Sequence, residues 1–406
     1  MMAVNDTELL ALRHALHRLP ELSMRERETK NRLMAFLGEH TELALHDMGH
    51  WFYAFRKGNV PGRIAFRADM DALPVPDEID AANRSQNPGI GHKCGHDGHA
   101  AVLCGAAAAL SGADSGDTVT EVSEDNAGGL RRLPDIYFVF QHAEETGEGG
   151  QECAAFLKAA GVQEVYAFHN RPGFPKGMIV CRRGITQPAS EGLTVRFRGE
   201  MSHASEPEKG RNPARAVSEL ALWTGTRASS RQADAGGLLL CTIVGIRVGT
   251  GDFGISPGEG ELAVTLRASR EADMLTLESE ILAEAGRLAA RDGLLLEHSV
   301  RDYFPATENA DACVRRVFLS AEQNGFPARE AEEIWRASED FGYYTAEIPG
   351  AMFYIGCGTD YPALHTTGYD FCDGILPAAV RMFTRIAALY GKEGPCVRKT
   401  EEVQKG

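Results

Sequence analysis

Four short apolar runs in this chain each lead into side chains that bind metals or move protons. The runs are rich in β-branched and aromatic residues, as buried strands are, and they cover residues 62–67, 136–140, 165–168 and 351–355. The groups that follow them are Asp69 and Asp71, His142, Glu144 and Glu145, His169 and, after a glycine-rich loop, His365. Ligands of an open α/β sheet bind beyond the carboxyl ends of its strands. The pattern therefore predicts a mostly parallel sheet flanked by helices, with a site at one edge.

A cluster of metal-binding residue types lies between the first two runs. Residues 91–99 hold one cysteine, three histidines and one aspartate. Cys94 and His96 can offer a thiolate and an imidazole to one divalent ion. The paired Cys-x2-Cys of a structural zinc site is absent, so further ligands must come from distant parts of the chain. The alternative is a histidine-rich turn that caps an alanine-rich helix, with Asp97 near its N-terminus.

The order of elements changes in the middle of the chain. Strands and helices are predicted there in the order β-α-β-β-α-β, which is that of a ferredoxin-like unit, and they cover residues 193–197, 213–224, 238–248, 262–268, 273–290 and 294–303. A chain of 406 residues also exceeds the usual size of one hydrophobic core. We therefore predict a catalytic domain made of residues 1–187 and 305–406, with a domain inserted at 188–304.

Charge and composition exclude some classes of partner. A net charge of −15 without an arginine-rich stripe argues against nucleic acid. There is no run of roughly 18 apolar residues and no basic and apolar leader, so we expect no membrane association and a cytoplasmic location. Nine cysteines without close pairing indicate reduced thiols. Residues 111–134 are expected to form an exposed loop, and the tail after Lys392 is expected to fray.

The chain resembles the metallopeptidase family that includes aminoacylases and glutamate carboxypeptidases. More narrowly, it resembles the amidohydrolase branch of that family, which includes hippurate hydrolases, N-acyl-amino-acid hydrolases and indole-acetyl-amino-acid hydrolases. The landmarks follow in order over nearly the whole chain: 16–23 (LHRLPELS), 67–74 (RADMDALP), 92–99 (HKCGHDGH), 141–145 (QHAEE), 202–204 (SHA), 338–341 (SEDF) and 364–366 (LHT).

The resemblance implies a site for two divalent metal ions and a homodimer formed through the inserted domain. The implied ligands are Cys94, His96, Glu145, His169 and His365, with Cys94 as the bridge. Mn²⁺ or Zn²⁺ are the first candidates, and Co²⁺ or Ni²⁺ also suit one thiolate with imidazoles and carboxylate.

Further roles follow from the same resemblance. Glu144 is the implied general base, and His203 of the partner subunit would reach over the scissile bond. Asp71 and His92 are expected to make hydrogen bonds around the ligands. Asp69 stands where other branches keep a metal-binding histidine, and we do not expect it to bind metal. Because adjacent side chains of a strand point to opposite faces, Glu144 and Glu145 can share one site only if the chain turns there.

The chain departs from the family branch at one substrate-binding position. Where the branch often carries Asn-Val-Ile-Pro, with the asparagine holding the substrate carboxylate, residues 254–257 read Gly-Ile-Ser-Pro. Arg267, at the end of the next predicted strand, remains as a carboxylate-binding candidate.

These observations favour an amidohydrolase that splits an N-acyl amino acid, or a related amide, into a carboxylic acid and an amine. Two alternatives stay open. One is a dipeptidase or aminopeptidase on the same scaffold, which would need a pocket for a free amino group. The other is a homologue that binds metal without turnover, although every expected ligand and Glu144 are retained.

Overall fold

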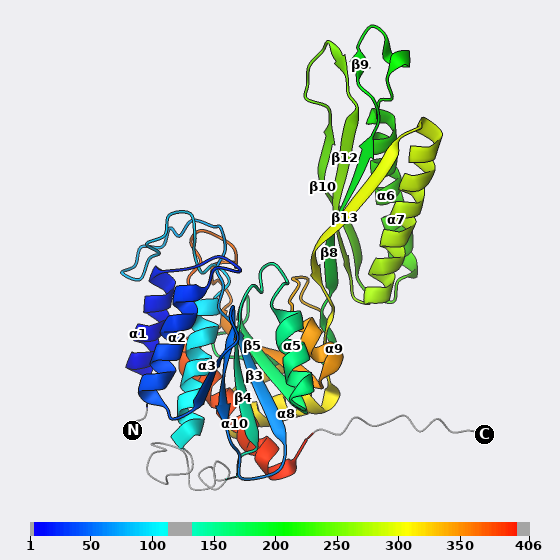
Figure 1. Cartoon of the computed structure of the whole chain (residues 1–406). Coiled ribbons are helices and arrows are strands. Elements are labelled where there is room, and N and C mark those ends of the chain that lie inside the picture. Colours follow the sequence, from blue (N-terminus) through cyan, green and yellow to red (C-terminus); the bar gives the residue numbers. More distant parts are fainter. Residues whose placement is uncertain (1–3, 113–131, 396–406) are drawn as a thin grey trace, which may run out of the picture. The chain divides into compact units, whose positions relative to one another are not determined.

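A computed structural model describes residues 4–112 and 132–395 and divides the chain into two compact units (Figure 1). The first unit comprises Met1–Thr186, Thr307–Ile334 and Asp340–Gly406, and the second comprises Gln187–Ala306 and Trp335–Glu339. The second unit thus begins and ends within two residues of the domain predicted at 188–304, and it also takes in 335–339, which the sequence did not indicate. Most of the predicted loop at 111–134, and the tail from 396 onward, lie outside the described residues.

The first unit is built on an eight-stranded sheet. Its strands lie in the order β1-β2-β4-β3-β5-β16-β6-β15. The central strands β4, β3, β5 and β16 are mutually parallel, while β1, β2 and β6 run antiparallel to neighbours. The bounds are β1 Ala44–Asp47, β2 Phe52–Arg56, β3 Arg63–Asp69, β4 Asp135–Gln141, β5 Glu164–Pro172, β6 Ile179–Cys181, β15 Ala328–Glu330 and β16 Gly350–Gly358. The four central strands are the four apolar runs of the sequence.

Helices cover this sheet and close its core (Figure 1). They are α1 Asp6–Arg18, α2 Arg27–His40, α3 His96–Ser111, α5 Gly150–Ala159, α8 Asp311–Gln323, α9 Gly342–Glu347 and α10 Leu376–Glu393, with a short 3-10 turn η3 at Asp373–Ile375. The core is aromatic where α10 meets the sheet: the ring centroid of Phe383 lies 4.9 Å from that of Phe66 and 5.8 Å from that of Phe168. Such pairs add to the burial of apolar area in holding helix and sheet together. The packed core fixes the strand ends that carry the candidate site.

The second unit has the predicted β-α-β-β-α-β order. Its four strands form an antiparallel sheet in the order β10-β12-β8-β13. The elements are β8 Ala189–Arg198, α6 Ala214–Asp234, β10 Leu239–Val248, β12 Glu259–Ala268, α7 Glu271–Asp292 and β13 Leu295–Phe304, with a small ribbon of β9 Ser202–His203 and β11 Ile255–Ser256 and a 3-10 turn η2 at Pro207–Lys209. A two-stranded sheet of β7 Gly184–Gln187 and β14 Thr307–Asn309 belongs, except for Gln187, to the first unit. The predicted fold class is confirmed.

Alternation of side chains explains why the second unit has one buried face. On β8, Val195 and Phe197 are buried while Arg196 and Arg198 are exposed. Period-two alternation of this kind puts one face of a strand in the core and the other in water. Leu277 and other apolar side chains of α7 belong to the same buried cluster.

None of the helices within 4–112 and 132–395 combines the length and the apolar character that a membrane crossing requires.

Candidate metal centre

The carboxyl ends of the central parallel strands bring the predicted groups to one edge of the sheet. Asp69 is paired with Gln141, and His169 is paired with Tyr354. β4 ends at Gln141, and Ala143 then adopts a positive φ of 50°. This positive φ turns the chain after the strand, which allows the adjacent side chains of Glu144 and Glu145 to lie in one site.

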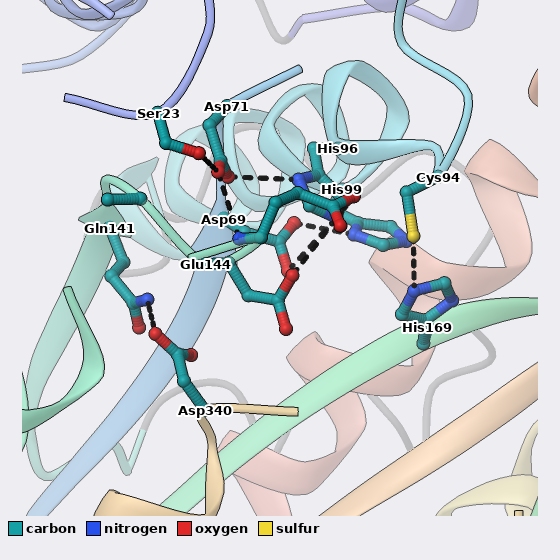
Figure 2. Close-up of polar contacts among 12 residues, drawn as sticks. Ser23, Asp69, Asp71, Cys94, His96, His99, Gln141, Glu144, His169 and Asp340 are labelled. Atoms are coloured by element: carbon teal, nitrogen blue, oxygen red, sulfur yellow. Dashed lines mark hydrogen bonds and ion pairs between the residues drawn. The ribbon is translucent and has the colours of Figure 1, made fainter. Parts of the chain in front are cut away.

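The N-terminus of α3 presents Cys94 and His96. Gly95 between them has a φ of 107°, and a Cβ added there would lie 2.3 Å from the side-chain oxygen of Asn170, so only glycine fits. The thiol sulfur of Cys94 lies 3.3 Å from Nε2 of His169 (Figure 2). Nδ1 of His169 is 2.7 Å from the carbonyl oxygen of Asn170 and donates to it, so Nε2 faces the sulfur as an acceptor.

His96 lies among carboxylates (Figure 2). Its Nδ1 donates to Oδ1 of Asp71 at 3.1 Å, which turns Nε2 toward the two glutamates. Nε2 is 3.7 Å from Oε1 of Glu145 and 3.8 Å from Oε2 of Glu144. Asp71 also accepts the Glu145 N–H at 3.0 Å. Asp71 therefore fixes both an expected ligand and the turn beside it, the role expected of it from the sequence.

His365 reaches the same place from the loop after β16. It has a φ of 62°, and its N–H donates to the carbonyl of Lys93 at 2.8 Å. Its Nε2 is 3.7 Å from Oε1 of Glu145. The side chain is 53% exposed, so this position lies where the cluster opens to solvent. All five predicted ligands thus meet within the first unit.

The donor set fits divalent metal ions. Nε2 of His96 and Oε1 of Glu145 are buried, and neither has a hydrogen-bond partner among the described residues. The ligand atoms of Cys94, His96 and His169 lie within 4.8 Å of one another, and so do those of Cys94, Glu145 and His365. One thiolate, imidazoles and a carboxylate suit Zn²⁺ and related ions. Cys94 belongs to both groups, as a residue that bridges two ions would.

Electrostatics favour a cation at this place. Burial alone would lower the pKa of His96, but Asp69, Asp71 and Glu145 outweigh it and raise that pKa to about 10. Burial, with Asp71 and Asp69, raises the pKa of Glu145 to about 8. Neighbouring carboxylates thus favour the protonated form of His96, and burial together with carboxylates favours that of Glu145. Binding of a metal ion would displace those protons, because ligands bind in their deprotonated forms.

Asp69 is occupied by other partners. One of its oxygens accepts from Nδ1 of His99 at 2.7 Å, and the other accepts from Arg67 at 2.7 Å. Arg67 in turn donates to Asp340 at 2.6 Å. Asp69 also lies with His96 and His99 in a group whose ligand atoms are within 4.8 Å of one another, so the expectation that it does not bind metal stays a prediction. Its contact with Arg67 links Asp340 of the 338–341 landmark to the strand end.

His92 differs from its predicted role. It is 1% exposed, and neither ring nitrogen has a hydrogen-bond partner among the described residues. Burial lowers its pKa to about 4. A neutral imidazole packed near His17, with ring centroids 6.2 Å apart, replaces the expected hydrogen bonding around the ligands.

Two residues that the sequence did not single out contact the site. Oδ1 of Asn170 lies 2.6 Å from Nε2 of His99, and Glu26 accepts the N–H of Ala143 at 2.7 Å. The only signal for Asn170 is its place directly after His169. Glu26 lies in a run of alternating charges, 25–28, which gives no sign of a buried side chain.

His203 and Arg267 belong to the second unit. His203 lies in β9 opposite Ile255, and its Nδ1 accepts from the N–H of Ser205 at 3.2 Å. Nδ1 also lies 2.7 Å from the Ser205 hydroxyl, which can donate or accept; when Nδ1 accepts from both groups, the ring proton is on Nε2. Arg267 donates to the carbonyl of Arg336 at 3.1 Å and to the hydroxyl of Ser338. Their catalytic and substrate-binding roles stay predictions.

A parallel sheet with metal donors at its carboxyl edge, and a ferredoxin-like unit inserted in the chain, defines a metal-dependent hydrolase. The chain belongs to peptidase family M20/M25/M40, whose model matches residues 65–389. The family predicted from the sequence is confirmed.

Two relatives of this chain are deacetylases, that is, amidohydrolases. The chain is 27% identical over 382 residues to N-acetyldiaminopimelate deacetylase of Lactobacillus helveticus (strain DPC 4571), covering 91% of this chain and 94% of that protein. It is 26% identical over 389 residues to N-acetylcysteine deacetylase of Bacillus subtilis (strain 168), covering 94% and 97%. The amidohydrolase class predicted from the sequence is confirmed.

Among solved structures, the fold is similar to that of a dinuclear metal-binding peptidase of the M20 family from Bacillus subtilis. The TM-score is 0.77 at 24% identity, over 95% of this chain and 98% of that one. This likeness concerns the fold.

Proposed function

We propose that this chain is a dinuclear metal-dependent amidohydrolase that converts an N-acyl amino acid into a carboxylic acid and a free amino acid. Cys94, His96, Glu145, His169 and His365 would hold the ions. The observation that carries this proposal is the sharing of Cys94 between two groups of converging donors. Mn²⁺ or Zn²⁺ are the first candidates, followed by Co²⁺ or Ni²⁺.

The chemistry assigned to this chain's own residues is proton transfer and charge stabilisation. When bound, two divalent ions lower the pKa of water and polarise an amide carbonyl. Glu144, with its carboxyl 3.8 Å from Nε2 of His96, takes the proton from the attacking water and delivers it to the leaving amine. Nε2–H of His203 of the partner subunit donates to the oxyanion, a contribution worth about 3 kcal/mol.

The second unit supplies the surface for the proposed homodimer. β10 is an edge strand of its sheet, and Val244 and Ile246 on it are 63% and 53% exposed. An exposed apolar edge strand pairs readily with another chain. A second copy of β10 would cover it, which supports association through this unit.

The names of the relatives support a short acyl group. Two are deacetylases of N-acetylated amino acids, so we infer an acetyl or similarly small acyl group on an amino acid. The first test is amine release from N-acetyl, N-benzoyl and N-indoleacetyl amino acids and from free dipeptides, with Mn²⁺- or Zn²⁺-loaded protein. We expect turnover of acylated amino acids, with N-acetyl substrates fastest, and none of dipeptides.

Each other outcome of that panel has a definite meaning. Cleavage of dipeptides alone would replace the proposal with a peptidase. No turnover of any substrate by protein that holds two metal ions would contradict the amidohydrolase proposal for these substrates. A loss of turnover on chelation, restored by metal, is expected of the true activity.

Gly254 offers a gain-of-function prediction. It stands where the family branch often has asparagine, next to Ile255, which pairs with His203, and a Cβ added to it meets no atom within 4 Å. Gly254→Asn is therefore expected to fold and to lower KM for substrates with a free α-carboxylate by about tenfold or more, the worth of one hydrogen bond to a charge. Steady-state kinetics on a substrate and its α-carboxamide checks this.

Gly254→Ala is the matched control, because it adds the Cβ without the amide. The prediction would be wrong if Gly254→Ala lowered KM as much as Gly254→Asn does. It would also be wrong if Gly254→Asn lowered KM equally for the carboxamide substrate, because the asparagine would then not bind the carboxylate.

A further inference from the structure

Glu26 holds the turn that carries the two glutamates. It directly precedes α2 and is 3% exposed. Its Oε1 accepts the N–H of Ala143 at 2.7 Å. No motif of the sequence singled it out, and the chemistry described above does not use it.

The contact with Glu26 is made at the residue of the turn that has a strained backbone. Ala143 has a φ of 50°, a conformation that costs an L-residue other than glycine roughly 1–2 kcal/mol. Ala143 is fully buried, so its N–H needs a partner from the protein. With this conformation the carboxyl groups of both Glu144 and Glu145 lie within 4 Å of Nε2 of His96, at 3.8 and 3.7 Å. Glu26 satisfies the N–H and thereby stabilises the strained turn.

The same segment also reaches the other end of the turn. Ser23 donates to Oδ2 of Asp71 at 2.7 Å, and that oxygen accepts the N–H of Glu145 at 3.0 Å (Figure 2). Residues 23–26 thus hold the N–H of Ala143 directly and the N–H of Glu145 through Asp71. Two anchors fix both the position and the direction of the turn.

We propose that Glu26 is a positioning residue that sets the geometry of the Glu144-Glu145 turn through the N–H of Ala143. This inference rests on the proposed roles of Glu144 as base and Glu145 as ligand. Glu26 touches neither the proposed metal ions nor the substrate and acts through the backbone alone.

The required feature of Glu26 is a buried acceptor, and a negative charge is not needed. Its second oxygen, Oε2, is buried and has no hydrogen-bond partner among the described residues. Burial, with the charge of Asp71 nearby, raises the pKa of Glu26 to about 7. A side-chain amide should therefore replace the carboxyl group, since its oxygen can accept the same N–H.

The test compares Glu26→Gln with Glu26→Ala, by kinetics and by the visible absorption spectrum of the Co²⁺-loaded protein. Glu26→Gln is expected to keep kcat within about threefold and to keep the spectrum. Glu26→Ala is expected to lower kcat by about 10- to 100-fold with KM little changed, the usual cost of losing a group that orients ligands, and to change the Co²⁺ spectrum. Adding Ala143→Gly to Glu26→Ala should recover part of kcat, because glycine adopts positive φ without strain.

Glu21→Ala is the matched control. Glu21 lies in the same connecting segment, and its carboxylate accepts from the N–H and the hydroxyl of Thr29, at 2.7 and 2.9 Å, at the start of α2. The variant is expected to lower the melting temperature without changing kcat or the Co²⁺ spectrum.

Several results would overturn the proposal. One is a wild-type kcat and Co²⁺ spectrum in Glu26→Ala. Another is a loss of kcat in Glu26→Gln as large as that in Glu26→Ala. A third is a fall in kcat and a changed Co²⁺ spectrum in Glu21→Ala. If the wild-type protein turned over none of the panel substrates, the proposed function would fail by itself. The Co²⁺ spectra of the Glu26 variants would still decide whether this residue positions the turn.

Discussion

Glu144→Gln is expected to lower kcat for an N-acyl amino acid by about 10²- to 10⁴-fold, the range that general acid–base catalysis supplies. Glutamine fills the same buried volume and can still accept hydrogen bonds, but it cannot take a proton from water. Glu144 is 5% exposed, so a smaller side chain would add a packing defect that glutamine avoids. KM should change little if the group acts mainly in the transition state.

The metal content of the variant separates a base from a ligand. Glu144→Gln should still bind two metal ions per chain, whereas Glu145→Gln should lose metal, because Oε1 of Glu145 lies 3.7 Å from both His96 and His365. Glu148→Gln is the control: this exposed glutamate accepts from Thr146 on the same turn and should keep full activity. Loss of metal from the Glu144 variant, or activity near wild type, would contradict the assignment.

The sequence predicted the part of the site that strand order alone determines. Asp71 and His169 follow apolar runs, and the runs are adjacent parallel strands, so their ends had to meet. Cys94 and His96 lie at the same edge because the helix that follows β3 begins there, at His96. Each of these positions depends on backbone topology, which hydrophobic patterns indicate well.

Features that depend on packing between distant side chains could not be predicted in the same way. The positive φ of Ala143 has no sequence signal, because alanine is ordinary in strand or helix. The contact of Glu26 with that turn joins residues 117 positions apart. His92 was expected to make hydrogen bonds because it adjoins the ligands in sequence, but its side chain is buried, with its ring 6.2 Å from that of His17.

Cys94→Ala is expected to reduce the metal content of the protein below two ions per chain and to lower kcat by about 10³-fold or more. The thiol is the one group shared by both sets of converging donors, so its removal weakens both proposed ion positions at once. His169 and His365 belong to different sets: His169 lies 3.3 Å from the sulfur, and His365 lies 3.7 Å from Glu145. Their alanine variants should therefore affect one ion more than the other.

Metal analysis at a fixed, buffered free-metal concentration measures this effect. Cys104→Ala is the matched control: its thiol is fully buried in α3, and burial holds its pKa well above the usual value, so it remains a neutral packing group. That variant should keep two ions and lose only a little stability. Two tightly held ions in Cys94→Ala would show that the sulfur does not bridge, and the carboxylate of Glu145, which lies 3.7 Å from both His96 and His365, would then be the bridging candidate.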